Sequence, residues 1–241
     1  EEVKIGIKCG FNREEILFTP NGVSFSEIKE AVSLGVKINL DSIESLKDFS
    51  KSYPNQPVSI RINPGVYAGG NENISVGHLN SKFGIPEERI DEIIEMELNE
   101  MVKVTTLHIH TGSDIIKDND FELGIKKIFS IACNFKHIET IDLGGGIKIP
   151  YFRGDTQTNL DNYAKIIIDE LKKFKLKKGK DLKLIFEPGK FLVSESGYFI
   201  TKVNYVKESS KNTFIQVDSG FNHFVRPTLY NSFHEIINLS N

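Results

Sequence analysis

Cysteine is scarce in this chain, and long apolar runs are missing. The 241 residues include two cysteines, Cys9 and Cys133, which lie far apart without a partnering motif. We therefore expect reduced thiols in a cytoplasmic protein, and neither a disulfide nor a cysteine metal site. No apolar run approaches the roughly 18 residues that span a membrane. No secretory signal is visible, and the opening residues Glu1 and Glu2 look like part of a helix already under way, which predicts a piece of a longer protein.

A strong excess of charge of one sign is also missing. The formal net charge is -3 at pH 7, so nothing electrostatic favours nucleic acid or an anionic membrane as a partner. The lysine-rich stretch 172–180 is typical of the solvated end of a helix, where cations complement the helix dipole. The length and the hydrophobic share of 39% suit one large soluble domain.

Short β-branched runs alternate with longer amphipathic runs. This alternation predicts an α/β fold with a parallel sheet buried on both faces. The short strands and the long repeat favour a (β/α)8 TIM-type barrel without its first one or two βα units, formed by residues 1–241 as one partial domain. An open Rossmann-like sheet would need a Gly-x-Gly-x-x-Gly turn after its first strand, which is missing. Strands are expected over 16–19, 36–40, 57–62, 104–109, 138–143, 182–186, 198–206 and 213–217, helices over 24–34, 42–53, 86–100, 119–134 and 159–174, and a long loop up to residue 84.

Polar or glycine-rich clusters follow five of the expected strands. They occupy residues 61–65, 108–113, 142–146, 187–190 and 218–222. Barrel enzymes build their sites at the C-terminal ends of the strands. Five such clusters on one rim therefore predict a ligand site rather than turn chemistry alone.

Three of these clusters carry groups suited to an anionic, heterocyclic ligand. Gly144, Gly145 and Gly146 leave backbone amides bare, which can cradle a phosphate, although a tight turn explains the glycines almost as well. Ser113 offers a hydroxyl to the same kind of anion. Glu187 follows a buried strand, where a carboxylate needs a partner. That partner is either a protonated ring nitrogen or a structural salt bridge or cap.

The two histidines near the rim allow a rival interpretation. We expect only one of His108 and His110 to face the barrel mouth, and we assign that place to His110 and a buried structural role to His108. A metal hydrolase that combines a histidine with Glu187 and Asp218 is the alternative site chemistry.

Taken together, the motifs resemble those of the fold-type III pyridoxal-phosphate decarboxylases. Their order and spacing match along nearly the whole chain, and the last two elements are similar to the diaminopimelate decarboxylases in particular. The motifs are Ser-Lys-Phe-Gly at 81–84, His-x-His-x-Gly-Ser at 108–113, Asp-Leu-Gly-Gly-Gly at 142–146, Glu-Pro-Gly at 187–189, Val-Asp-Ser-Gly-Phe-Asn at 217–222 and Arg-Pro-x-Leu-Tyr at 226–230.

The resemblance implies pyridoxal 5'-phosphate as cofactor and a role for each matching residue. His110 would stack on the ring, and Glu187 would pair with the pyridine nitrogen. Arg61 and Asn63 would support the site or make structural loop bonds. The phosphate would be held by Ser113, Gly144, Gly145, Gly146 and Gly189, with Pro188 and Lys190 beside them, and the substrate by Lys190, Arg226 and Tyr230.

The resemblance also implies an activity, and the chain departs from the family pattern at three points. It implies decarboxylation of meso-diaminopimelate to lysine and carbon dioxide by a homodimer with shared sites. The family's Schiff-base lysine and its C-terminal β domain have no match here, so we expect residues 1–241 alone to be inactive. Position 190 is Lys where the family usually has Arg, which loses the bidentate fork. A decarboxylase of D-ornithine or D-lysine and a non-catalytic cofactor-binding homologue therefore stay open.

Overall fold

Seven parallel strands form the wall of an incomplete barrel. The computed structural model describes residues 1–66, 77, 81–116 and 118–240. The strands β1 (Leu17–Phe18), β2 (Lys37–Leu40), β3 (Pro57–Asn63), β5 (Lys103–Ile109), β6 (Thr140–Asp142) and β7 (Lys183–Ile185) lie side by side in chain order, and β4 (Ile85–Pro86) pairs with β3. Every pairing in this sheet is parallel. The predicted α/β barrel wall is therefore confirmed.

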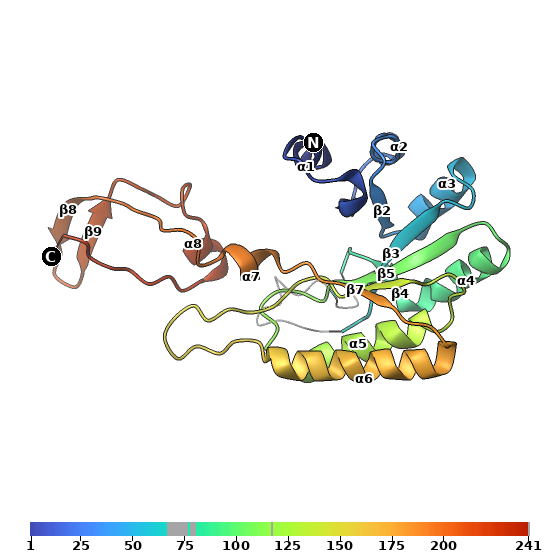
Figure 1. Ribbon diagram of the computed structural model, residues 1–241. Coiled ribbons are helices and arrows are strands. Elements are labelled where there is room, and N and C mark those ends of the chain that lie inside the picture. Colours follow the sequence, from blue (N-terminus) through green and yellow to red (C-terminus); the bar gives the residue numbers. More distant parts are fainter. Residues whose placement is uncertain (67–76, 78–80, 117, 241) are drawn as a thin grey trace.

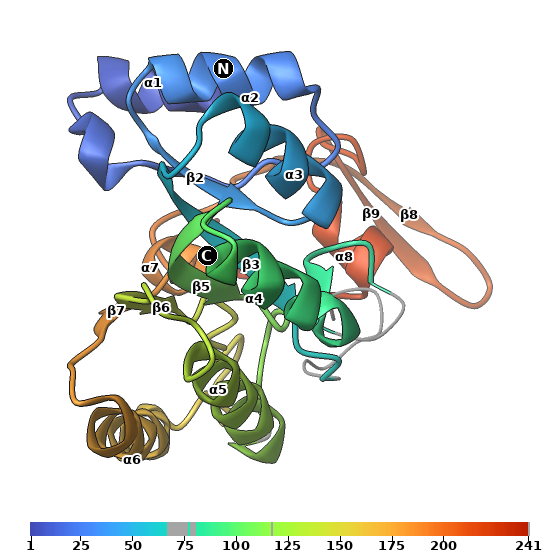
Figure 2. The ribbon, with the colours of Figure 1, turned by 90° about the vertical axis from the view of Figure 1, so that its right-hand side faces the viewer.

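Helices cover one face of this sheet and fall close to their predicted bounds (Figures 1 and 2). The sequence sets their ends: Ser24 and Glu27 form the predicted capping box of α2, and Gly179 ends α6 at a φ of 69°. The α-helices are α1 (Glu2–Lys8), α2 (Phe25–Ser33), α3 (Ile43–Ser52), α4 (Ile90–Leu98), α5 (Asp118–Ala132) and α6 (Leu160–Lys178), with 3-10 turns η1 (Arg13–Glu15) and η3 (Glu87–Arg89). In the described residues, no helix is both long and apolar enough to cross a membrane.

The two faces of the sheet differ in chemistry. Alternate residues of a strand point to opposite faces. Ile60 pairs in register with Leu40 and Leu107, and all three are fully buried against the helices. The residues between them, such as Ser59 and His108, are polar and face the interior of the barrel. The apolar face builds the core, and the polar face is left for a ligand site.

The last part of the chain forms a second, smaller sheet. The strands β8 (Val203–Glu208) and β9 (Thr213–Val217) are confirmed, but they pair with each other in antiparallel fashion and do not join the parallel sheet. Figure 1 shows this hairpin beyond the short helix α7 (Gly189–Val193), with α8 (Arg226–Tyr230) close by. The cluster at 218–222 follows β9, so the expectation that it shares the rim of the barrel strands was wrong. Most of the loop expected before residue 84 lies outside the described residues.

Candidate active site

Strand register assembles the centre of the site. Arg61 on β3 is the register partner of His108 on β5, which in turn pairs with Asp142 on β6. Asp142 pairs with Ile185 on β7, and Glu187 follows two residues later on the same face. The Nε2 atom of His108 lies 3.6 Å from Oε2 of Glu187. One side-chain atom each from His108, Asp142 and Glu187 falls within 4.8 Å of the others.

The glycine loop after β6 holds three strand ends together. Gly144 has a φ of 65°, and a Cβ there would lie 2.5 Å from the backbone oxygen of Ile109. Its N–H donates to Oδ1 of Asp142 at 2.9 Å, and its carbonyl accepts the N–H of Glu187 at 2.8 Å. A side chain at Gly146 would meet the carbonyl of Gly112. Only glycine fits this close approach, and the bare backbone lies next to Glu187.

His110 packs against the same loop. The N–H of Gly145 donates to Nδ1 of His110 at 3.2 Å, so the proton of the neutral ring is on Nε2. Burial, together with the charge of Arg61, lowers the pKa of His110 to about 4. The expectation that only one histidine faces the barrel interior was wrong, because His108 and His110 are two residues apart and share a face. His108 is buried as predicted, with 2% exposure, but it lies beside Glu187.

Asp142 and Glu187 form a carboxylate pair in which Asp142 is fully buried and the Glu187 side chain is 41% exposed. Burial, and then the charge of Glu187, raises the pKa of Asp142 to about 7. Burial also raises the pKa of Glu187, while the positive charge of Arg61 and the contact with Asp142 oppose that rise. Two carboxyl groups this close favour sharing one proton. The guanidinium of Arg61 makes the place unfavourable for a metal cation.

The metal hydrolase hypothesis needed Asp218 next to Glu187. In the structure, Asp218 accepts hydrogen bonds from Thr201 Oγ1 at 2.6 Å and from the N–H of Lys202 at 2.9 Å. These contacts place it with the β8–β9 hairpin. The residues that this hypothesis combined therefore do not form one site in the described part of the chain.

A second polar cluster lies around Tyr151. Lys190 Nζ contacts Asp114 Oδ1 at 2.5 Å, and the Tyr151 hydroxyl lies 3.5 Å from the same oxygen. The Tyr151 ring centroid is 5.6 Å from Lys190 Nζ and 6.0 Å from Arg226 Cζ. The structure thus brings the two predicted substrate cations together. Asp114 and Tyr151 were not predicted, although Asp114 directly follows the His-x-His-x-Gly-Ser motif.

The remaining predicted site residues occupy the surroundings of these two clusters. Ser113 is half-buried, in the segment that reaches the glycine loop through a bond from Ile115 N to Gly146 O of 3.0 Å. Pro188 precedes α7, and a Cβ at Gly189 would meet open space. Tyr230, one turn beyond Arg226, is 42% exposed.

The two uncertain rim residues differ in their roles. Arg61 lies with Cζ 4.8 Å from the ring centroid of Phe83 and affects the pKa of Glu187 and of both histidines. Asn63 Oδ1 accepts the N–H of Gly65 at 3.0 Å, which is a structural loop bond. Arg61 therefore contributes charge to the site, whereas this bond of Asn63 shapes the strand end.

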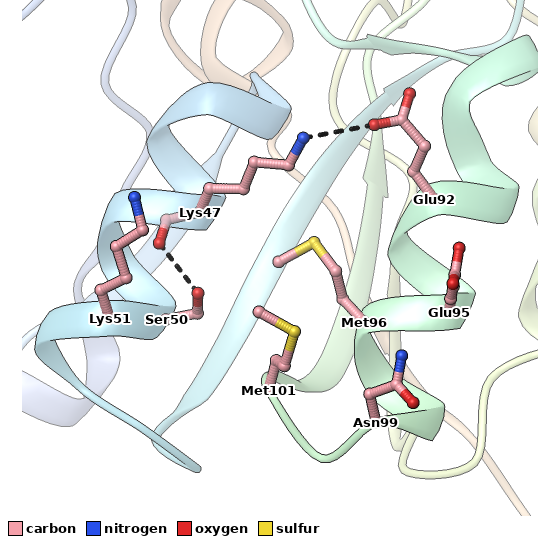
Figure 3. Close-up of a pocket in the computed structure, with 8 residues that line it drawn as sticks. All are labelled: Lys47, Ser50, Lys51, Glu92, Glu95, Met96, Asn99 and Met101. Atoms are coloured by element: carbon pink, nitrogen blue, oxygen red, sulfur yellow. Dashed lines mark hydrogen bonds and ion pairs between the residues drawn. The ribbon is translucent and has the colours of Figure 1, made fainter.

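A groove of about 330 Å³ lies elsewhere, between α3 and α4 on the helical layer. Figure 3 shows Lys47 and Ser50 of α3 facing Glu92 and Met96 of α4, with Met101 beside them. Lys47 Nζ reaches Glu92 Oε2 at 3.5 Å. None of the predicted site residues lines this groove, so its residues serve as controls for the site.

Comparison with known proteins places this chain among amino-acid decarboxylases. It is 34% identical over 246 residues to the diaminopimelate decarboxylase of Methanothermobacter thermautotrophicus, which covers 98% of this chain and 56% of that protein. The structure of diaminopimelate decarboxylase from Helicobacter pylori complexed with L-lysine matches with a TM-score of 0.84 and 31% identity, over 97% of this chain and 60% of that chain. The Paramecium bursaria Chlorella virus arginine decarboxylase bound to agmatine, at 19% identity and a TM-score of 0.76 over 96% of this chain and 61% of that one, shows the shared fold alone.

The match includes the candidate site but spans only part of the length of the relatives. The chain spans 56% and 58% of the length of two archaeal relatives. The family model for the pyridoxal-dependent decarboxylases, pyridoxal binding domain, matches residues 1–194. That range contains the parallel sheet, the carboxylate pair, the glycine loop and Lys190. This chain therefore belongs to the pyridoxal-dependent decarboxylase family, through its pyridoxal-binding domain, and its cofactor is pyridoxal phosphate.

Proposed function

We propose that the protein containing these residues decarboxylates meso-diaminopimelate to lysine and carbon dioxide, as a cytoplasmic homodimer with shared sites. The observation that carries the proposal is the carboxylate of Glu187, which lies beside Arg61, His108 and the glycine loop on the polar face of the barrel. A carboxylate that stays open to the barrel interior in this setting suits a protonated ring nitrogen. The named relatives supply the reaction class.

The residues present fit pyridoxal phosphate. Glu187 would keep the proton on the ring nitrogen, and the neutral His110 would stack on the ring. The phosphate would be surrounded by Ser113, Gly144, Gly145, Gly146 and Gly189, because the glycines lack side chains where the phosphate oxygens need to approach the backbone. When bound, the cofactor withdraws the electrons that remain on the substrate after carbon dioxide leaves. The protein supplies orientation and charge.

Lys190 and Arg226 would bind the substrate. Both cations lie near the ring of Tyr151, and one carboxylate, Asp114, pairs with Lys190. The surplus positive charge suits a substrate carboxylate, which the fork of Arg226 can grip with two hydrogen bonds. Tyr230 would contact the polar end of the substrate. The ion pair of Lys190 with Asp114 favours one second candidate, a decarboxylase of D-ornithine or D-lysine, since these substrates lack the second carboxylate.

Carbon dioxide release from the full-length protein tests this function. The protein with pyridoxal phosphate is given meso-diaminopimelate, D-ornithine or D-lysine in separate assays. We expect release from meso-diaminopimelate and its loss in Glu187→Gln, which cannot hold a charged ring nitrogen. Release from D-ornithine or D-lysine alone would favour the second candidate. Cofactor absorbance without release from any of the three would identify a non-catalytic homologue.

A further inference from the structure

A row of buried polar side chains lies behind Glu187, away from the rim. Asn39 and Asp142 have no exposed surface, and His108 is 2% exposed. Asn39 Nδ2 lies 2.7 Å from His108 Nδ1, and His108 Nε2 lies 3.6 Å from Glu187 Oε2. Burying a polar side chain costs free energy unless hydrogen bonds compensate for the lost contact with water. The proposed binding of cofactor and substrate uses none of these three side chains, so their burial close to Glu187 requires another explanation.

The hydrogen bonds around Asn39 fix the direction of this row. Ser59 Oγ donates to Asn39 Oδ1 at 2.9 Å, so the amide group faces Thr19 Oγ1 at 3.1 Å and His108 Nδ1 at 2.7 Å. An amide only donates through nitrogen, and Nδ1 of His108 must therefore accept. Burial first, and then the charges of Arg61 and His110, lower the pKa of His108 to about 3. The ring is neutral, and its one proton is on Nε2, which has no hydrogen-bond partner among the described residues and lies 3.6 Å from Glu187 Oε2.

Asp142 approaches Glu187 from the neighbouring strand. Its Oδ1 accepts the N–H of Gly144 at 2.9 Å, while its Oδ2 is buried and has no hydrogen-bond partner among the described residues. Because the pKa of Asp142 is raised to about 7, a proton on Oδ2 is favoured below that pH and can be donated to Glu187. Among the described residues, the ionisable groups that face Glu187 are thus Arg61 from β3, His108 from β5 and Asp142 from β6, and Asp41 faces Arg61.

We propose that Asn39 is a positioning residue that acts through His108: it fixes the imidazole proton on Nε2, and this N–H, 3.6 Å from Glu187 Oε2, favours electrostatically the anion that meets the cofactor nitrogen. The inference rests on the proposed place of Glu187 opposite that nitrogen. It assigns a function to a side chain on β2, two strands away from β5 in the sheet. Without the amide donor, the proton of His108 can move to Nδ1, which leaves the lone pair of Nε2 facing Glu187. That lone pair repels the carboxylate and favours the protonated form of Glu187.

The test measures the pH dependence of cofactor binding to the full-length protein. Asn39→Leu removes the donor, and Ser59→Ala removes only the bond that orients the amide. Ser50→Ala is a matched control, because Ser50 and Ser59 are 6% and 5% exposed and each hydroxyl donates one bond, of 2.8 Å to Lys47 O and of 2.9 Å to Asn39. Ser50 lines the groove between α3 and α4 (Figure 3). Urea denaturation verifies that each variant is folded.

The expected change is confined to acidic pH. A protonated Glu187 loses its charge, so the acidic limb of cofactor affinity and of the visible absorbance of the bound cofactor should move to higher pH. We expect a shift of about one pH unit in Asn39→Leu, which is roughly tenfold weaker binding on that limb, and a smaller shift in Ser59→Ala. Binding at pH 8.5 should stay within about twofold, and Ser50→Ala should follow the wild type.

Three results would overturn the inference in distinguishable ways. If Glu187→Gln weakens cofactor binding but Asn39→Leu and Ser59→Ala behave like Ser50→Ala, the relay is wrong while the cofactor site stands. Equal weakening by Asn39→Leu at every pH would likewise indicate a merely structural role. If Glu187→Gln leaves binding and absorbance unchanged, the proposed cofactor site is wrong, and the relay is wrong with it.

Discussion

Substitutions that break the ion pair between Asp114 and Lys190 should lower the free energy of unfolding, because this pair stabilises the protein beside the candidate site. Asp114 adopts a φ of 56°, a conformation that Asn tolerates, so Asp114→Asn removes the charge with little change in backbone preference. Lys190→Met removes the cation and keeps most of the aliphatic stem. The double variant closes a thermodynamic cycle, which isolates the coupling between the two side chains.

The structure sets the size of this coupling. The side chains are 18% and 28% exposed and meet at 2.5 Å, so the pair is neither fully solvated nor fully buried. Two charges at about 4 Å and an effective dielectric constant of about 20 attract by about 4 kcal/mol. Partial desolvation and lost side-chain entropy oppose most of this attraction. We expect a net coupling of about 1–2 kcal/mol.

Urea denaturation of the full-length protein and its variants measures the coupling as changes in the free energy of unfolding. The pair of Lys47 and Glu92 in Figure 3 is the control, because its side chains are 47% and 43% exposed and 3.5 Å apart. Its coupling should be clearly weaker than that of Asp114 with Lys190, because water screens exposed ion pairs. Equal coupling energies for the two pairs would refute the reasoning, since burial would then have no effect on the interaction of Asp114 with Lys190.

Three other features of the structure can be tested by substitution. Gly144→Ala should destabilise the protein by about 2–4 kcal/mol, because its Cβ would collide with backbone, whereas Gly154→Ala, at a φ of 90° in open space, should cost about 1–2 kcal/mol in the same urea titration. Burial raises the pKa of Asp142 from 3.8 to about 7, so between these pH values the folded protein binds a proton that the unfolded chain has lost. The contribution of this group to the free energy of unfolding should therefore fall as pH rises from about 4 through 7. Asp142→Asn should flatten that decline by an amount on the order of 1–3 kcal/mol between urea titrations at pH 5 and pH 7.5. Lys148→Met should leave Asp155, only 14% exposed, without the cation that contacts it at 2.5 Å, which should cost about 3 kcal/mol and speed proteolysis of the loop around residue 155.

Local patterns predicted the elements and the ends of the site strands. The capping box at Ser24 and the glycine after α6 act within a few residues, so their effect can be read directly from the sequence. Clusters after apolar runs predicted that Glu187 and the glycine loop would lie together, because parallel strands end at one rim. The same rule misplaced the cluster at 218–222, since β9 pairs antiparallel with β8. Chain order alone does not decide which strands pair.

The residues that sequence reasoning missed are those whose role depends on register. Asn39 lies inside an apolar run, and no local signal connects it with His108, 69 positions away. The connection arises because β2, β3 and β5 align Asn39 with Ser59, and place Arg61, two residues on, opposite His108. A shift by one residue would turn each polar side chain into the helical layer. The buried polar row therefore requires one register across these strands, and the same register that buries the apolar face places a donor behind Glu187.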